Sequence, residues 1–264
     1  MLKETKMKNI IILLIIPFIS FSQTKGLIYY GYIESLPNGN AKGNDYNTYM
    51  IFNSEMANYV TAKDSLEKSE KGVEAKTSHD DNGDVFITSG LKVSAEGDQV
   101  IYNIKKKTMW SNFLFKEQVY VKEVVPVINW KIFNETKKIG NFKCKKATAN
   151  FRGREYTAWF TNEISVPFGP WKLQGLPGLI LEAYDTNKHV YWYFKSIEYP
   201  SKSKENVQYM KIPKNKTFKN YNQLKIFQNE QIESNKETQR IVKKDYPNVI
   251  FDEPKKEYLF IECE

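Results

Sequence analysis

The chain has 264 residues and a formal net charge of +8 at pH 7, carried by 39 Lys and Arg against 31 Asp and Glu. The basic residues are spread along the whole chain and alternate with acidic ones, and no segment interleaves them with aromatic residues as a single-strand-binding groove does. This pattern is typical of a solvated surface of mixed charge, and it argues against nucleic acid as a partner.

The first 22 residues have the pattern of a secretory signal peptide. Three lysines precede an apolar run over 10–19, and the small residues Ser20 and Ser22 favour cleavage after position 22. The apolar run is shorter than the ~20 residues that span a membrane, so the mature protein is predicted not to span it. We therefore expect residues 1–22 to be removed and 23–264 to form a single exported, β-rich domain.

Short runs rich in β-branched and aromatic residues follow one another along most of the chain. The run over 26–35 predicts a strand that ends at a Pro-Asn-Gly turn, and 46–61 predicts a strand pair. Residues 62–84 are strongly polar and are predicted to form a loop, with a short helix at its start as an alternative. Nine further strand-like runs follow between 85 and 199.

Turns separate these runs at regular intervals. The predicted turns lie at 105–107, 135–137, 152–154 and 185–188. Many short strands at ~8–12-residue spacing predict an antiparallel meander, sandwich or half-barrel sheet, with one face buried and one solvated.

The segment 217–244 is the exception, because its spacing is helical. Apolar residues recur every three positions from Phe218 to Phe227, which predicts a helix with one apolar face. Thr217 is the predicted N-cap and Pro247 the predicted stop. A basic amphipathic helix can lie on a membrane, but we expect this one to cover the sheet. The predicted fold is therefore mainly β (β-rich α+β), with one long C-terminal amphipathic helix packed on an antiparallel meander or half-barrel sheet.

The most distinctive stretch reads GPWKLQGLPGLILEAYD over 169–185. Leu176–Leu179 is predicted to form a type II turn, because Pro177 presets the backbone at the second position and Gly178 tolerates the positive φ at the third. The result is a tightly folded apolar loop, which is either a rigid corner that sets strand register or a hydrophobic recognition loop. The candidate binding residues are Trp171, Gly175, Leu176, Pro177, Gly178, Leu179 and Ile180.

This stretch resembles the signature of the GLPGLI family, exported bacterial proteins named for the hexapeptide that stands intact at Gly175–Ile180. Upstream segments fit the same pattern at 130–132, 138–140, 143–147, 153–161 and 169–171. The resemblance covers about 26–200. It implies a β-rich fold, export to the periplasm or cell surface of a Gram-negative bacterium, and association with outer-membrane uptake or secretion systems. It implies no particular biochemical activity. The strand pattern with its helix also resembles the half-barrel lipoprotein carriers.

The sequence offers few groups for catalysis. Neither His79 nor His189 has a second His or Cys at ligand spacing, so no zinc site is predicted, and no G-x-S-x-G elbow occurs. The acidic run 80–84 does not fit a calcium loop, because Val85 replaces the expected glycine and Leu91 the expected bidentate glutamate. We therefore expect a non-catalytic protein without a metal or cofactor.

Three other features bear on structure and binding. Cys144 and Cys263 could pair in an oxidising compartment or could both stay free. The Arg152-Gly153-Arg154 turn could hold an acidic partner or a phosphate, although a solvated hairpin tip with Arg154 bridging to a carboxylate is the simpler interpretation. The aromatic residues of 191–194 alternate between two faces, which suits a central strand or the wall of an apolar pocket.

We therefore expect an exported, non-catalytic binding or assembly protein of the cell envelope, accessory to an outer-membrane transport or secretion system. Its protein partner would contact the bend over 176–180 together with Trp171. One alternative is a periplasmic carrier of a hydrophobic ligand such as a lipid, held between the curved sheet and the helix. Another is a hydrolase whose carboxylates are scattered in the sequence, for example Glu155, Glu163, Glu182 and Asp185.

Overall fold

The structure is a computed structural model that describes residues 24–61, 76–79, 85–88, 97–115, 117–204 and 217–264. The predicted signal peptide, most of the predicted loop over 62–84, and the acidic run 80–84 lie outside the described residues.

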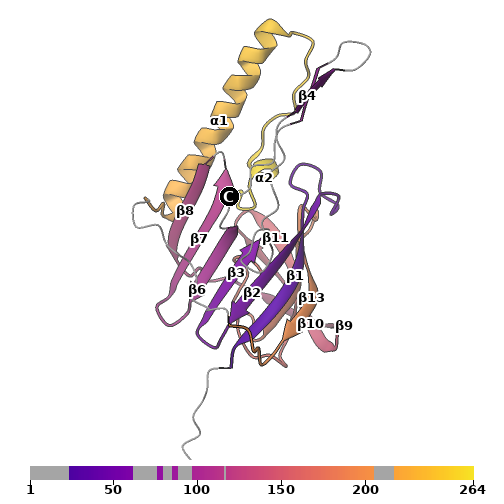
Figure 1. Ribbon diagram of the computed structural model, residues 1–264, viewed down its shortest axis with the longest axis vertical. Helices are drawn as coiled ribbons and strands as arrows, with labels where there is room; N and C mark the ends of the chain where they lie inside the picture. Colours follow the sequence, from indigo (N-terminus) through magenta and orange to yellow (C-terminus); the bar gives the residue numbers. More distant parts are fainter. Residues whose placement is uncertain (1–23, 62–75, 80–84, 89–96, 116, 205–216) are drawn as a thin grey trace, which may run out of the picture.

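Eleven strands form one large, open antiparallel sheet, as the strand-rich sequence predicts (Figure 1). The strands are β1 (Gly26–Glu34), β2 (Asn44–Phe52), β3 (Met56–Thr61), β6 (Asp98–Asn103), β7 (Thr108–Phe115), β8 (Glu117–Val124), β9 (Lys131–Ile139), β10 (Phe142–Phe151), β11 (Arg154–Thr161), β12 (Leu179–Asp185) and β13 (Val190–Glu198). A separate hairpin pairs β4 (Lys76–His79) with β5 (Val85–Thr88), so the predicted loop is wrong for 76–79.

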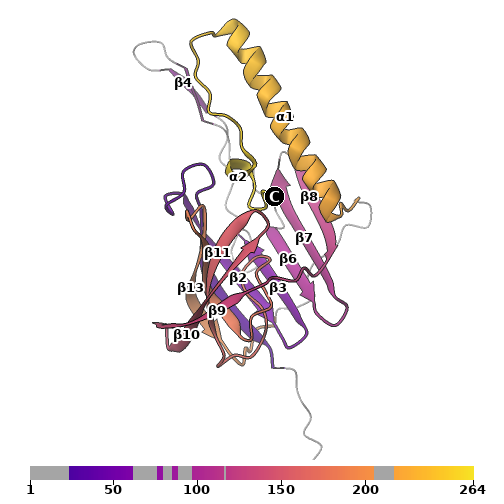
Figure 2. The ribbon, with the colours of Figure 1, turned by 180° about the vertical axis from the view of Figure 1, so that it is seen from behind.

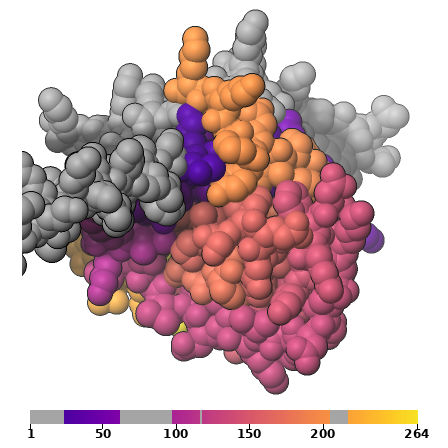
Figure 3. Space-filling view, turned by 90° about the horizontal axis from the view of Figure 1, so that it is seen from below, coloured from indigo at the N-terminus to yellow at the C-terminus, as the bar shows by residue number. Residues whose placement is uncertain are grey.

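The sheet consists of two meanders joined at their first and last strands. Its order is β8-β7-β6-β3-β2-β1-β13-β12-β11-β10-β9, so β1 pairs with β13 and the consecutive strands β8 and β9 form the two edges. The sheet wraps around a concave face, with β11 behind β3 in one view and in front of it in the opposite view (Figures 1 and 2). Seen from below, the indigo start of the described chain lies directly against the orange β13 region (Figure 3).

Most of the predicted turns are present. Lys107, Arg152 and Lys188 adopt left-handed φ values of 51°, 53° and 51° at three of the predicted positions. The predicted turn at 135–137 is wrong, because β9 continues through it and pairs with β10. β9 is an edge strand whose side chains are mostly exposed, so its polar residues look like a turn in the sequence.

The predicted C-terminal helix is confirmed as α1 (Tyr221–Asp245), and a short helix α2 (Lys256–Leu259) follows it. Asn220, not Thr217, is the N-cap, and it forms a capping box with Gln223. The helix starts later because Lys219 is extended and bridges to β8, where its N–H and C=O pair with backbone groups at an otherwise open edge.

The buried face of α1 packs on β8 beside the concave side of the sheet. Leu224 and Phe227 form a cluster with Val119, Val121 and Phe260. This packing is the helix-on-sheet contact that the apolar spacing predicts. No helix in the described part of the chain has both the length and the apolar character needed to cross a membrane.

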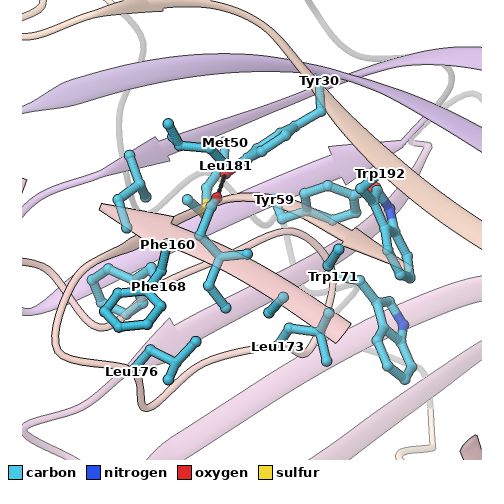
Figure 4. Close-up of a cluster of buried hydrophobic side chains, with 14 of the residues drawn as sticks. Tyr30, Met50, Tyr59, Phe160, Phe168, Trp171, Leu173, Leu176, Leu181 and Trp192 are labelled. Carbon is cyan, nitrogen blue, oxygen red and sulfur yellow. Dashed lines mark hydrogen bonds between the residues drawn. The ribbon is translucent and has the colours of Figure 1, made fainter. Parts of the chain in front are cut away.

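The loop between β11 and β12 (residues 162–178), which we call the plug, folds into the concave side of the sheet. Phe168, Leu173 and Leu176 are at most 1% exposed and belong to the main core (Figure 4). A buried loop brings backbone carbonyls into the core, where they need donors. The Tyr102 hydroxyl donates to the carbonyl of Trp171 (2.8 Å), and the Trp130 indole N–H donates to that of Gln174 (2.8 Å). Aromatic residues with polar tips therefore anchor the plug.

The predicted type II turn at Leu176–Leu179 is wrong, because the left-handed glycine is Gly175 (φ 92°) and Gly178 is outside that region. Gly178 is required for a different reason. A Cβ at this position would lie 2.1 Å from the carbonyl oxygen of Thr161, so only glycine lets the plug rejoin the sheet this closely.

Candidate binding site

A cavity of about 140 Å³ lies beyond the Trp171 end of the plug. Its lining includes Tyr32, Tyr59, Ser111 and Trp192 from the sheet, Trp171 and Lys172 from the plug, Gln228 from α1, and the C-terminal residues Leu259–Glu262. Pockets for drug-sized ligands are typically ~300–1,000 Å³. This cavity therefore suits a small molecule or one end of a larger one.

A column of stacked aromatic rings forms one wall of the cavity. The ring centroids of Tyr32 and Trp192 are 5.1 Å apart, with an interplanar angle of 14°. Those of Trp192 and Trp171, both labelled in Figure 4, are 5.9 Å apart, with an interplanar angle of 11°. The indole N–H of Trp192 donates to the Tyr59 hydroxyl (2.8 Å). Each such aromatic pair stabilises the folded state by roughly 0.5–1.5 kcal/mol beyond the contribution of its buried area. These contacts hold the wall in place.

Trp171 adopts a left-handed backbone conformation, with a φ of 53°. A bulky residue is rarely found there, because its Cβ crowds the following carbonyl, at a cost of roughly 1–2 kcal/mol. Its stacking on Trp192 and the hydrogen bond to its carbonyl oppose that cost. Strained residues of this kind cluster at functional sites, so the strain draws attention to this end of the plug.

Two carboxyl groups, Glu34 at the end of β1 and Asp98 at the start of β6, border the cavity. The Tyr32 hydroxyl donates to Glu34 Oε2 (2.7 Å), and the Leu114 amide donates to Asp98 Oδ1 (3.1 Å). Burial raises the pKa of Glu34, although the Tyr32 hydrogen bond and the Arg154 charge oppose this. Burial, followed by the charge of Glu34, raises the pKa of Asp98 to about 7.

Two more polar side chains face this space. Ser111 is 4% exposed and lies two residues from the core residue Met109 on the same face of β7, yet its hydroxyl has no hydrogen-bond partner within the described residues. Gln228 donates through Nε2 to the carbonyl of Glu262 (2.8 Å), which leaves its Oε1 without a donor from the described chain. The Ser111 hydroxyl is therefore available to donate or accept a hydrogen bond inside the cavity.

A buried ion cluster (Glu123, Arg152, Lys172 and Glu262) lies next to the cavity, with every side chain at most 9% exposed. Lys172 Nζ lies 2.9 Å from Glu123 Oε1 and also contacts Glu262, while Arg152 pairs with the same two carboxylates. The Arg152 guanidinium lies 3.3 Å from the centroid of the Tyr221 ring. The predicted solvated hairpin tip is therefore wrong, because the C-terminal segment and α1 cover it.

Arg154 fastens the C-terminal segment to the sheet. Its Nη1 lies 3.3 Å from Asp185 Oδ2, which confirms the predicted bridge to a carboxylate, and His189 Nδ1 lies 3.0 Å from the same oxygen. The other N–H groups of Arg154 donate to the backbone carbonyls of Glu257, Phe260 and Ile261. The residues that close the cavity are thus held by charge-assisted hydrogen bonds.

The structure places the candidate binding residues of the sequence analysis in different environments. Leu176, Leu179 and Ile180 are buried, and Gly175 and Pro177, which are exposed, carry no polar side-chain group. The plug is therefore a rigid corner in the core, and of the candidate binding residues only Trp171 lines the cavity.

The four carboxylates of the hydrolase alternative do not converge, and none of them lines the cavity. Glu182 pairs with Lys137 (2.7 Å), whereas Glu155 accepts a hydrogen bond from Thr186. Glu163 accepts one from the Lys143 amide and Asp185 pairs with Arg154.

Glu34, Asp98 and Ser111 are functional candidates that the sequence analysis missed. Glu34 has the same inward parity as Tyr30 and Tyr32, and Asp98 the same as Val100 and Tyr102. A polar residue at an inward position of a strand was the signal that could have identified them.

The two cysteines are both free, so the disulfide considered from the sequence is not formed. Cys263 lies against the Arg152-Gly153 tip at the end of β10, whereas Cys144 lies near the start of that strand. Eight residues of strand separate the two ends, a distance of roughly 25 Å at ~3.3 Å per residue. A disulfide requires Cα atoms within about 7 Å.

Comparisons with known proteins agree with the fold and leave the activity open. Residues 151–182, which hold β11, the plug and the start of β12, match the family described as "Protein of unknown function (Porph_ging)". The curated proteins give no match.

Two solved structures of PNGF-II are similar in fold. The structure in the P21 space group has a TM-score of 0.51 at 18% identity, and the structure in the C2 space group has a TM-score of 0.50 at 20% identity. Both comparisons cover 76% of this chain and 32% of PNGF-II, so the chain spans about a third of the length of the protein it resembles.

Proposed function

We propose that this chain is an exported, non-catalytic binding protein of the cell envelope, which holds a small ligand, or one end of a larger ligand, in the cavity beside Trp171. The signal-like N-terminus supports export. The observation that carries the proposal is the convergence of Glu34, Asp98 and the unpaired Ser111 on a space with a rigid aromatic wall.

The surroundings of the cavity are preorganised, which favours binding. The plug, the aromatic column and the buried ion cluster hold the lining residues before any ligand arrives. Binding then loses little conformational entropy, because few side chains remain to be ordered.

Three alternatives fit less well. A lipid carrier needs a long apolar channel, whereas this cavity is small and is lined by Glu34, Asp98, Lys172 and Glu262. A docking loop at the hexapeptide would need exposed aliphatic side chains, and these are buried. Binding without turnover is favoured over hydrolysis because the lining hydroxyls of Thr61 and Ser111 form no hydrogen bond with a His, Asp or Glu in the described chain.

A fragment screen with a cavity-filling variant tests the proposal. Small polar fragments that bind the 23–264 protein should raise its melting temperature and change the fluorescence of Trp171 and Trp192. Ser111→Leu fills the cavity and should abolish both responses, whereas Ser234→Leu, on the exposed side of α1, should keep them. Fragments that bind both variants equally, or a screen without any binder, would contradict the proposal.

A further inference from the structure

Among the residues that the structure describes, the acidic side chains around the cavity outnumber the basic ones. Five carboxylates (Glu34, Asp98, Glu123, Asp185 and Glu262) face three permanent cations (Arg152, Arg154 and Lys172). All three cations are already engaged: Arg152 and Lys172 with Glu123 and Glu262, and Arg154 with Asp185. His189 also lies against Asp185.

Glu34 and Asp98 are the two carboxyl groups left over. Neither has a cation within ion-pair distance among the residues that the structure describes. Each accepts one hydrogen bond on one oxygen, from Tyr32 and from the Leu114 amide respectively. Both residues are partly buried. A charge that is withdrawn from water without a partner is costly, so a bound positive group would remove an existing penalty.

The remaining lining points to the same kind of ligand. The open polar positions are mainly acceptors: one oxygen each on Glu34 and Asp98, together with Gln228 Oε1 and the Ser111 hydroxyl, which can also donate. A ligand that satisfies them must donate several hydrogen bonds.

We propose that the cavity binds an organic cation, an ammonium or guanidinium group, with Glu34 and Asp98 as its counter-charges and Ser111 as a hydrogen-bond partner. This inference rests on the proposed binding function and names the class of ligand. It also agrees with the pKa values of both carboxyl groups, which burial raises.

Other ligand classes match the cavity less well. A neutral polyol would satisfy the acceptors but leave the two charges uncompensated. An anion would meet two carboxylates and, among the described residues, no free cation. A hard metal ion needs six or more oxygen ligands in a closed shell, whereas aromatic rings form much of this lining.

A pair of isosteric probes separates charge from shape. Methylguanidinium and methylurea have nearly the same size and planarity, but only methylguanidinium carries a charge. By calorimetry at pH 8 and low salt, methylguanidinium should bind the 23–264 protein at least tenfold more tightly than methylurea or glucose. Ser111→Leu should abolish this binding.

The double variant Glu34→Gln/Asp98→Asn removes the two counter-charges and keeps the side-chain shapes. It should weaken methylguanidinium binding at least tenfold. The control Asp252→Asn/Glu253→Gln removes the same charge from two exposed positions outside the cavity and should bind as the wild type does. Circular dichroism shows whether each variant is folded.

The outcomes separate the two proposals. If methylurea or glucose binds as tightly as methylguanidinium and Ser111→Leu abolishes that binding, the cavity is a binding site for neutral ligands and the inference of a cation is overturned. If methylguanidinium binds the Glu34→Gln/Asp98→Asn variant unchanged, the counter-charge assignment is overturned. If no probe binds, or all bind Ser111→Leu equally, both proposals fail.

Discussion

Lys172 Nζ lies 2.9 Å from Glu123 Oε1, and the two side chains are only 1% and 6% exposed. Lys172 belongs to the plug and Glu123 to β8, while Glu262, the second partner of Lys172, belongs to the C-terminal segment. A single ammonium group thus connects three parts of the chain that are distant in sequence. It does so at the border of the cavity, which Lys172 and Glu262 line.

Replacing this lysine should strongly destabilise the protein. Lys172→Met keeps the length of the side chain but leaves Glu123 and Glu262 with only Arg152 as a cation. Breaking a buried ion pair on one side costs about 3–5 kcal/mol, because it leaves an uncompensated charge. Urea unfolding measures this cost. The matched control is Lys236→Met, which removes an exposed pair with Glu233 and should change the free energy of unfolding far less, because exposed ion pairs contribute little. Equal effects of the two changes would show that the cluster does not act as a buried unit.

The two glycines of the hexapeptide should respond differently to alanine. Gly178→Ala places a Cβ 2.1 Å from the Thr161 carbonyl oxygen, so the backbone must move and we expect a loss of several kcal/mol, or no folded protein. In Gly175→Ala the added Cβ has no atom within 4 Å, and only the φ of 92° disfavours alanine. The free energy of unfolding should therefore fall by about 1–2 kcal/mol. Thermal unfolding compares the two. A larger loss at Gly175 than at Gly178 would contradict the close approach of Gly178 to the Thr161 carbonyl.

The regular elements of the fold could be predicted from the sequence because their signals are local. The alternation in β13 places Trp192 inward and Tyr191 and Tyr193 outward, and the spacing of Leu224 and Phe227 gives the buried face of α1. The helix start was less accurate, because Lys219 prefers the edge of β8 to a helical turn. That preference depends on a partner nearly a hundred residues earlier in the chain.

The site could not be predicted because it depends on pairings between distant segments. Glu34 and Asp98 meet only through the pairing of β1 with β2, β2 with β3 and β3 with β6. Arg152 is at a hairpin tip, and residues at such tips are ordinarily exposed to solvent. Here Arg152 is buried by Tyr221 and Glu262, which are distant from it in the sequence. The plug shows that a loop whose sequence resembles a surface turn can be buried when remote side chains, here Tyr102 and Trp130, supply hydrogen-bond donors.

The hexapeptide should behave as core rather than as a contact surface. Leu176 is 1% exposed, so Leu176→Ala leaves a cavity and should cost about 2–5 kcal/mol. Ile250 is 92% exposed, and Ile250→Ala should change the free energy of unfolding by less than about 0.5 kcal/mol. Urea unfolding with circular dichroism checks both values. A stable, fully folded Leu176→Asp variant would contradict the assignment of this residue to the core.

The cysteines should react as two separate thiols. Cys144 is fully buried, and burial raises its pKa to about 11, so iodoacetamide at pH 8 should leave it unmodified in the folded protein. Cys263 is partly exposed and should be alkylated slowly, since burial also raises the pKa of its thiol. In denaturant without a reductant, mass spectrometry should find both alkylated. Labelling that requires a reductant would show that the two cysteines pair after all.

Asp98 should make the protein less stable as the pH rises. Its pKa is about 7 in the folded state against 3.8 for an ordinary aspartate, so between these values the folded state binds more protons than the unfolded state. The free energy of unfolding therefore falls as the pH rises from about 4 to 7, by roughly 4 kcal/mol for a shift of this size, and the loss is complete above pH 7.

The variant Asp98→Asn should remove this part of the pH dependence. At pH 4 the two proteins should be about equally stable, because the aspartate is then largely protonated in the folded protein. At pH 8 the variant should be more stable by up to roughly 4 kcal/mol, since the amide carries no charge to bury. Glu34 also faces Asp98 and has a raised pKa, so a smaller slope of the same sign should remain in the variant. Urea unfolding at half-unit pH steps measures both profiles, with the exposed Asp252→Asn as the matched control. A profile of Asp98→Asn parallel to that of the wild type would show that Asp98 already has a counter-charge, and it would remove the main support for a cation-binding cavity.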